Sequence, residues 1–136
     1  MTIIAHTDGA SRGNPGESGI GIVMKDEQGR VIRWLGGYIG KATNNVAEYV
    51  ALLTCLKKVQ ETDCTRLIVH SDSELLVRQM QGRYRVRDAE LRKYYQRVHR
   101  ILAKGPFTFE IRHVSREDNR DADLLANTGI DSRRRV

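Results

Sequence analysis

The chain has 136 residues, of which 40% are hydrophobic and 29% are charged, and its net charge is +6. This length allows one domain with one hydrophobic core. No apolar run approaches the roughly 20 residues of a membrane-spanning helix, and the N-terminus has no signal-peptide pattern, so we expect a cytoplasmic protein without a membrane partner. The basic charge favours an anionic partner such as nucleic acid.

The first third of the chain predicts a strand-rich segment. Three β-branched and apolar runs read as strands, at residues 2–7, 19–24 and 31–39. A loop rich in glycine, asparagine and proline (residues 9–16) should end the first strand. The turn at residues 26–29 makes the other two strands antiparallel neighbours. Gly36 and Gly37 indicate a bulge or a close backbone approach in the third strand.

Helical periodicity begins after these strands. Val46, Val50 and Leu53 follow the spacing of an amphipathic helix that starts near Asn44, with Thr43 or Asn44 as its N-cap. The remaining elements are a buried strand at 66–70, helices at 75–81 and 88–103, a strand at 107–114 and a short helix at 121–128.

The predicted order is therefore β-β-β-α-β-α-α-β-α. A hairpin followed by right-handed crossovers gives an α/β fold with a mixed five-stranded sheet and helices on both faces. We expect residues 1–130 to form a single domain, and the basic residues 131–136 to form a disordered tail. Cys55 and Cys64 lack metal-site spacing and are expected to be free thiols in a reducing compartment.

Four carboxylates fall on the same side of this predicted sheet. Asp8 follows the first strand and Asp72 follows the fourth, so parallel neighbouring strands would bring both to one sheet edge. Glu48 lies early in the first helix, and Asp123 lies early in the last one. Each residue has a simpler explanation when taken alone: Asp8 as a turn residue, Asp72 as a helix cap, and Glu48 and Asp123 as charges near helix N-termini.

Together, however, several carboxylates in one pocket repel one another and stay ionised only when cations neutralise them. Oxygen ligands suit Mg²⁺ or Mn²⁺, and two such ions can position the attacking water and the leaving oxygen of a phosphodiester. We therefore expect a metal site at Asp8, Glu48, Asp72 and Asp123.

Four segments resemble the four motifs of type 1 ribonuclease H. They are DGASRGNPG (residues 8–16), TNNVAE (43–48), SDS (71–73) and NRDADLLAN (119–127). The resemblance implies a ribonuclease H-like fold and an endonuclease that cleaves the RNA strand of RNA–DNA hybrids to 5′-phosphate and 3′-hydroxyl products. It also implies that Asp8, Glu48, Asp72 and Asp123 bind two Mg²⁺ ions, with Mn²⁺ as a possible substitute.

The family often has a histidine about ten residues before its last aspartate, where it assists proton transfer or product release. His113 occupies this position, but it ends a predicted strand, whereas Arg116 lies in the following loop and could steady the phosphate instead. Both stay open as catalytic residues, and a structural role for His113 is the third possibility.

Substrate contacts are expected from the loops around the acidic residues. Asn14, Asn44, Asn45 and the backbone of Gly13 can bond 2′-hydroxyl groups and base edges of a hybrid, and Thr43 resembles the family's phosphate contact on the DNA strand. The same residues also suit ordinary turns and helix caps.

Many family members carry a basic protrusion that grips the hybrid, but only residues 82–87 stand in its place, with three arginines. Weaker binding with a steep salt dependence is therefore expected. The alternatives to a hybrid nuclease are a nuclease that also or instead cuts double-stranded RNA, and a non-catalytic nucleic-acid binding module. We expect a monomer.

Overall fold

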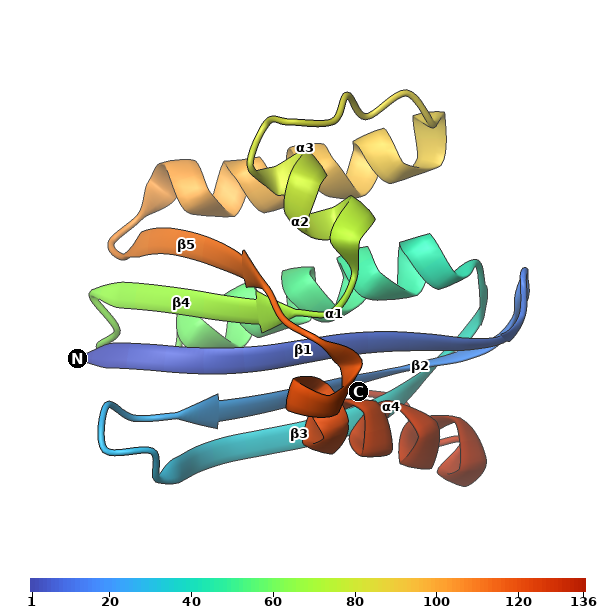
Figure 1. Ribbon diagram of the computed structural model, residues 1–136, viewed down its shortest axis with the longest axis horizontal. Helices are drawn as coiled ribbons and strands as arrows, with labels where there is room; N and C mark the ends of the chain where they lie inside the picture. The colour runs from blue at the N-terminus through green and yellow to red at the C-terminus, as the bar shows by residue number, and fades with distance from the viewer.

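The computed structural model describes residues 1–136 and shows one mixed β-sheet flanked by helices (Figure 1). The strands are β1 (Thr2–Gly13), β2 (Gly16–Lys25), β3 (Val31–Ala42), β4 (Arg66–Ser71) and β5 (Thr108–His113). The helices are α1 (Asn44–Val59), α2 (Glu74–Met80), α3 (Ala89–Lys104) and α4 (Arg120–Ser132), with a short 3₁₀ turn, η1, at Arg116–Asn119. This order confirms the predicted β-β-β-α-β-α-α-β-α arrangement.

The sheet has the strand order β3-β2-β1-β4-β5, so β1 is central. β2 pairs antiparallel with both β1 and β3, whereas β4 pairs parallel with β1 and with β5. The parallel pairing of β1 with β4 ends at Thr7 and Ser71, but the antiparallel pairing of β1 with β2 continues to Gly13 and Gly16. The central strand therefore has a partner on one side only along its second half.

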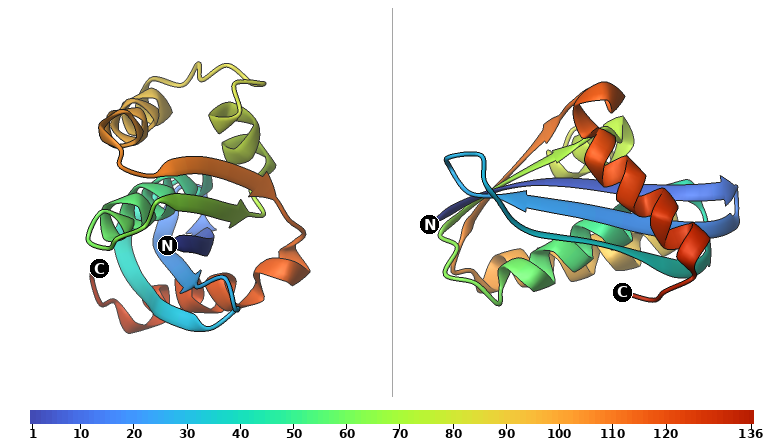
Figure 2. Two further views of the ribbon diagram at one scale, coloured as in Figure 1. Left: turned by 90° about the vertical axis from the view of Figure 1, so that its left-hand side faces the viewer. Right: turned by 90° about the horizontal axis from the view of Figure 1, so that it is seen from below.

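Helices cover both faces of the sheet, as predicted (Figure 2). α1 packs on β1 and β2 with α3 beside it, whereas α4 packs on the opposite face against β2 and β3. The main core lies between the sheet and α1, where Ile3, Ile22, Leu52, Leu56 and Leu67 are fully buried. Burial of this apolar surface is the main driving force for the fold.

Glycines let α4 approach the sheet closely. A Cβ added to Gly21 would lie 2.0 Å from the carbonyl oxygen of Ala122, and one added to Gly36 would lie 2.5 Å from that of Leu125. A Cβ on Gly129 of the helix would in turn lie 2.6 Å from the backbone of Gly37. The close approach predicted from Gly36 and Gly37 is therefore real, and its partner is α4.

Two features differ from the sequence-based expectation. The expected loop at residues 9–16 is instead a continuation of the β1–β2 hairpin, because the two strands keep pairing up to the turn. The residues that were expected to form a disordered tail (131–136) are also ordered in part, because α4 continues to Ser132. After the helix, the carbonyl of Arg134 accepts a hydrogen bond from the backbone N–H of Tyr38 at 2.6 Å. Arg133 and Arg135 lie over the ring of Tyr38, 5.2 and 5.0 Å from its centroid. Backbone pairing and cation–π contacts thus hold this segment against β3.

Both cysteines are buried free thiols, as expected. None of the helices has the length and apolar character that a membrane crossing requires.

Candidate active site

The site lies where β4 separates from β1. Beyond Thr7, the edge of β1 that faced β4 has no strand partner, and two side chains bond its backbone instead. The N–H of Gly9 donates to Oε1 of Glu48 at 2.6 Å, and Nδ2 of Asn119 donates to the carbonyl of Thr7 at 2.9 Å. The opening between the two strands is therefore a structured polar site, because buried backbone groups need such partners.

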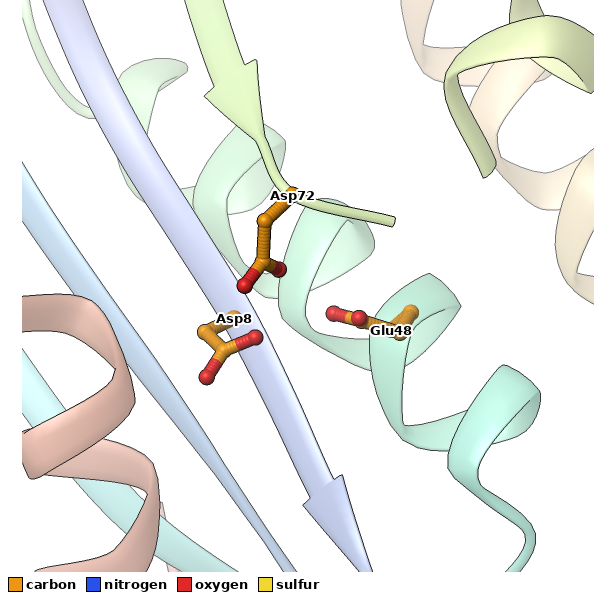
Figure 3. A group of neighbouring side chains, drawn as sticks. All are labelled: Asp8, Glu48 and Asp72. Carbon is orange, nitrogen blue, oxygen red and sulfur yellow. The ribbon is translucent and has the colours of Figure 1, made fainter. Parts of the chain in front are cut away.

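Three carboxylates meet in this opening (Figure 3). Asp8 comes from the middle of β1, Glu48 from α1 and Asp72 from the residue after β4, and one oxygen from each lies within 4.8 Å of the others. Asp8 and Glu48 are each only 4% exposed. The predicted convergence of Asp8 and Asp72 is confirmed, although Asp8 lies within its strand and not at its end.

Asp123 completes the same pocket from α4. It lines a cavity of about 290 Å³ together with the three carboxylates. Nδ2 of Asn127 donates to the backbone carbonyl of Asp123 at 3.0 Å and to its Oδ1 at 3.3 Å, so one turn of helix orients this carboxylate. All four predicted acids therefore surround one cavity.

Each of these acids had a simpler explanation, and the structure tests that of Asp72. The N-cap of α2 is Ser73, whose hydroxyl accepts from the N–H of Leu76 at 3.2 Å. Ser71 accepts from the N–H of Ser73 at 3.1 Å. Asp72 therefore does not cap α2, and its side chain points into the cavity together with that of Asp8 (Figure 3).

The electrostatics of this cluster are unfavourable in the absence of a cation. Burial, together with the charges of Glu48 and Asp72, raises the pKa of Asp8 far above its ordinary value. Burial and the charge of Asp72 also raise the pKa of Glu48, although the hydrogen bond from Gly9 and the charge of Arg116 oppose this rise. A positive charge in the cavity would remove this penalty.

The donor set fits a hard divalent cation. Carboxylate oxygens are the ligands that Mg²⁺ and Mn²⁺ prefer, and three of them already lie close together. No histidine or cysteine lines the cavity, so a zinc site of the nitrogen or sulfur type is not favoured.

The two candidates for the loop role lie in different surroundings. Arg116, at the start of η1, lines the cavity, and its Nε lies 3.9 Å from Oδ2 of Asp72. Its side chain is 89% exposed and therefore free to reorient. His113 is the last residue of β5, is exposed and does not line the cavity.

Of the predicted substrate residues, only Asn44 lines the cavity, and the others lie at the tip of the β1–β2 hairpin and at the start of α1. Asn14 lies at the tip of the β1–β2 hairpin, and its Oδ1 accepts from the N–H of Asn44 at 3.0 Å, which ties the hairpin to the start of α1. Thr43, one of the two residues expected at this place, is the N-cap of α1, and its hydroxyl accepts from the N–H of Val46 at 3.2 Å. Asn44 lines the cavity, whereas Gly13 adopts a positive φ of 104° beside the turn. Asn45 is exposed in the first turn of α1.

Sequence reasoning gave no role to Asn119, which is 1% exposed. Its bond to Thr7 places the start of α4 beside β1, one residue before Asp8. The only sequence signal was its place four residues before Asp123 in the last motif, where an asparagine also suits a helix cap.

Comparisons with known proteins agree with this arrangement. A family model described as reverse transcriptase-like matches residues 6–129. Ribonuclease HI of Halobacterium salinarum is 38% identical over 127 residues, which are 93% of this chain and 63% of that protein, so the chain spans less than two thirds of this relative.

Two solved structures are similar along nearly their whole length. RNase H1 from Halobacterium salinarum has a TM-score of 0.92 and 36% identity, with 97% of this chain and 99% of that chain covered. LC11-RNase H1, solved in complex with an RNA/DNA hybrid, has a TM-score of 0.91 and 41% identity, with 96% and 97% covered.

Proposed function

Because the chain belongs to the type 1 ribonuclease H family, we propose that it hydrolyses the RNA strand of RNA–DNA hybrids to 5′-phosphate and 3′-hydroxyl products. The observation that carries this proposal is the convergence of Asp8, Glu48 and Asp72 within 4.8 Å, with Asp123 on the same cavity. A protein that only binds nucleic acid has no use for a buried group of carboxylates that repels its ligand.

We infer that these four acids hold two Mg²⁺ ions, with Mn²⁺ as a substitute. Such ions, when bound, activate a water and neutralise charge on the scissile phosphate. Glu48 is held by the N–H of Gly9, and Asp123 is held by Asn127, so both carboxylates are fixed before substrate arrives. Fixed ligands avoid the reorganisation that would otherwise slow the reaction.

Arg116 is proposed as the residue that attracts the phosphate. Support comes from its place beside Asp72 and from its exposed side chain, which could leave the carboxylate for a phosphate oxygen. His113 would need a substrate that reaches the end of β5, and it stays the alternative for proton transfer or product release.

We propose that the hairpin tip and the start of α1 distinguish the RNA strand of the hybrid from its DNA strand. Asn14, Asn44 and Asn45, with the backbone of Gly13, offer donors and acceptors for 2′-hydroxyl groups, and Thr43 offers a hydroxyl for a phosphate of the DNA strand. The hydrogen bond between Asn14 and Asn44 holds these two segments together as one substrate-binding surface. Since one chain supplies all of these residues, we propose a monomer; its cytoplasmic location stays a prediction.

Cleavage of end-labelled duplexes tests the proposal. The wild type should cut the RNA strand of a hybrid with Mg²⁺ or Mn²⁺, and Asp8→Asn should reduce the rate at least a hundredfold because one ligand charge is lost. The exposed Asp63 provides a matched control, since Asp63→Asn changes the same group outside the site. A hybrid that stays intact with either metal would overturn the proposed activity, and cleavage of double-stranded RNA alone would change the substrate.

A further inference from the structure

The positive charge of the protein is concentrated in one part of the chain. Residues 83–104 contain eight basic and two acidic side chains, so they supply the whole excess of +6, and the remaining residues are balanced. All eight basic side chains are exposed. None of them forms an ion pair, in contrast to Arg133 of the C-terminal segment, which pairs with Glu17 at 3.3 Å.

Four of these residues form a line on α3, which we call the basic stripe. They follow the helical spacing i, i+4, i+7 and i+11 and are Lys93, Arg97, Arg100 and Lys104. The buried residues of the same helix, Leu91 and Val98, face the core beside α1. At 1.5 Å of rise per residue, the stripe is about 16 Å long. It lies on the outermost helix of its layer (Figure 2), and no residue of α3 lines the acidic cavity.

The arrangement is unfavourable for the helix by itself. Lys93 lies four residues before Arg97, and Arg100 lies four residues before Lys104, so like charges are neighbours on the helix surface and repel each other. Glu90 is the only acidic residue of α3. If this face had no role beyond contact with water, acidic residues between the basic ones would stabilise the helix through ion pairs. The stripe has no such acidic residues, so no anion of the protein compensates its charge.

We propose that the basic stripe binds the phosphate backbone of a nucleic-acid duplex at a place separate from the acidic cavity. On each strand of a duplex, successive phosphates are about 3.4 Å apart along the helix axis. A line of cations about 16 Å long therefore spans several phosphates and can contact them at the same time. The proposed contacts are to phosphates, which carry no sequence information, so this binding is independent of base sequence. It would keep the protein on nucleic acid between cleavage events.

A nucleic acid fits this surface better than a membrane does. The large apolar residues of α3 face the core, and none of the protein's exposed large hydrophobic side chains belongs to this helix. A helix that lies on a membrane needs an exposed apolar face to insert beside its charges.

The test is binding of a labelled duplex DNA by the whole chain in EDTA, measured by fluorescence anisotropy over a salt series. Replacement of all four stripe residues by Gln should weaken binding roughly ten- to hundredfold at about 0.1 M salt and reduce the slope of log K against log salt by about 3 to 4. A control with the same loss of charge replaces Arg30, Arg33, Lys57 and Arg66 by Gln; these exposed residues lie outside residues 83–104. It should change the affinity less than about threefold.

The conservative double variant Arg97→Lys, Arg100→Lys should retain binding, because a phosphate track needs charge and not fork geometry. The rate of cleavage of a short hybrid should stay unchanged in all stripe variants. Binding of duplex DNA is measured without catalysis, so the result of the binding test does not depend on whether the protein has the proposed nuclease activity. Equal losses in the stripe and control variants would overturn the proposal, as would unchanged binding. Stronger binding to vesicles of phosphatidylcholine and phosphatidylserine than to DNA would also refute it.

Discussion

Replacement of Asp8 by Asn should stabilise the metal-free protein while it removes the activity. Asp8 is buried beside Glu48 and Asp72, and its pKa is raised from 3.8 to about 10, mainly by burial and then by these two charges. The pKa of this acid is higher in the folded state than in the unfolded state, so the folded state holds the proton more tightly. The contribution of Asp8 to stability is therefore most favourable below about pH 4 and falls as the pH rises from there toward about 10.

The magnitude follows from this linkage. Keeping one carboxyl protonated at pH 7, about three pH units above its unfolded pKa, costs about 4 kcal/mol at most. The cavity opens to water and water screens the charges, so we expect Asp8→Asn to raise the free energy of unfolding by roughly 1 to 3 kcal/mol. For a domain of this size that corresponds to a rise in Tm of roughly 3 to 10 °C. An amide is similar in size to the carboxyl, so packing should change little.

Thermal unfolding in EDTA at pH 5 and pH 8 measures this effect. The Tm of the wild type should fall between the two pH values more steeply than that of Asp8→Asn, and the variant should melt higher at pH 8. Added Mg²⁺ should raise the Tm of the wild type more than that of the variant, because binding to the folded state alone stabilises it. If Asp8→Asn melted at or below the wild type at pH 8 in EDTA, the carboxylate repulsion inferred here would be refuted.

Four further substitutions test the architecture and the site. Gly21→Val should destabilise the protein by about 3 kcal/mol or more in urea unfolding, since even its Cβ would lie 2.0 Å from the carbonyl oxygen of Ala122; unfolding at the wild-type midpoint would contradict the packing of α4. Asn119→Ala should cost about 1 to 3 kcal/mol in the same assay, because the carbonyl next to Asp8 loses its donor at 2.9 Å. Arg116→Ala should lower kcat on a hybrid roughly tenfold or more, and His113→Ala should lower it less; the reverse order would assign the loop role to the histidine.

The sequence alone predicted the elements and the identity of the acids. Strand and helix periodicity are local properties, so they predicted the order of the nine elements and limited the N-cap of α1 to Thr43 or Asn44, of which the structure has Thr43. The four motifs together singled out Asp8, Glu48, Asp72 and Asp123 among 17 acidic residues, although only the two motifs at residues 8–16 and 43–48 are specific by themselves. The glycines of the third strand also predicted that another backbone segment approaches this strand closely, but they did not indicate that the segment is α4.

Only the tertiary structure decided why these acids meet. Asp8 was expected at the end of a strand, but β1 continues through it, and what ends there is the pairing with β4. Glu48 and Asn119 come from distant parts of the chain to bond the backbone groups that β4 leaves free. The same holds for the C-terminal segment, whose contacts with Tyr38 no local pattern could reveal. Such contacts depend on which strand edges lie open in space, and local periodicity carries no information about the partner of an edge.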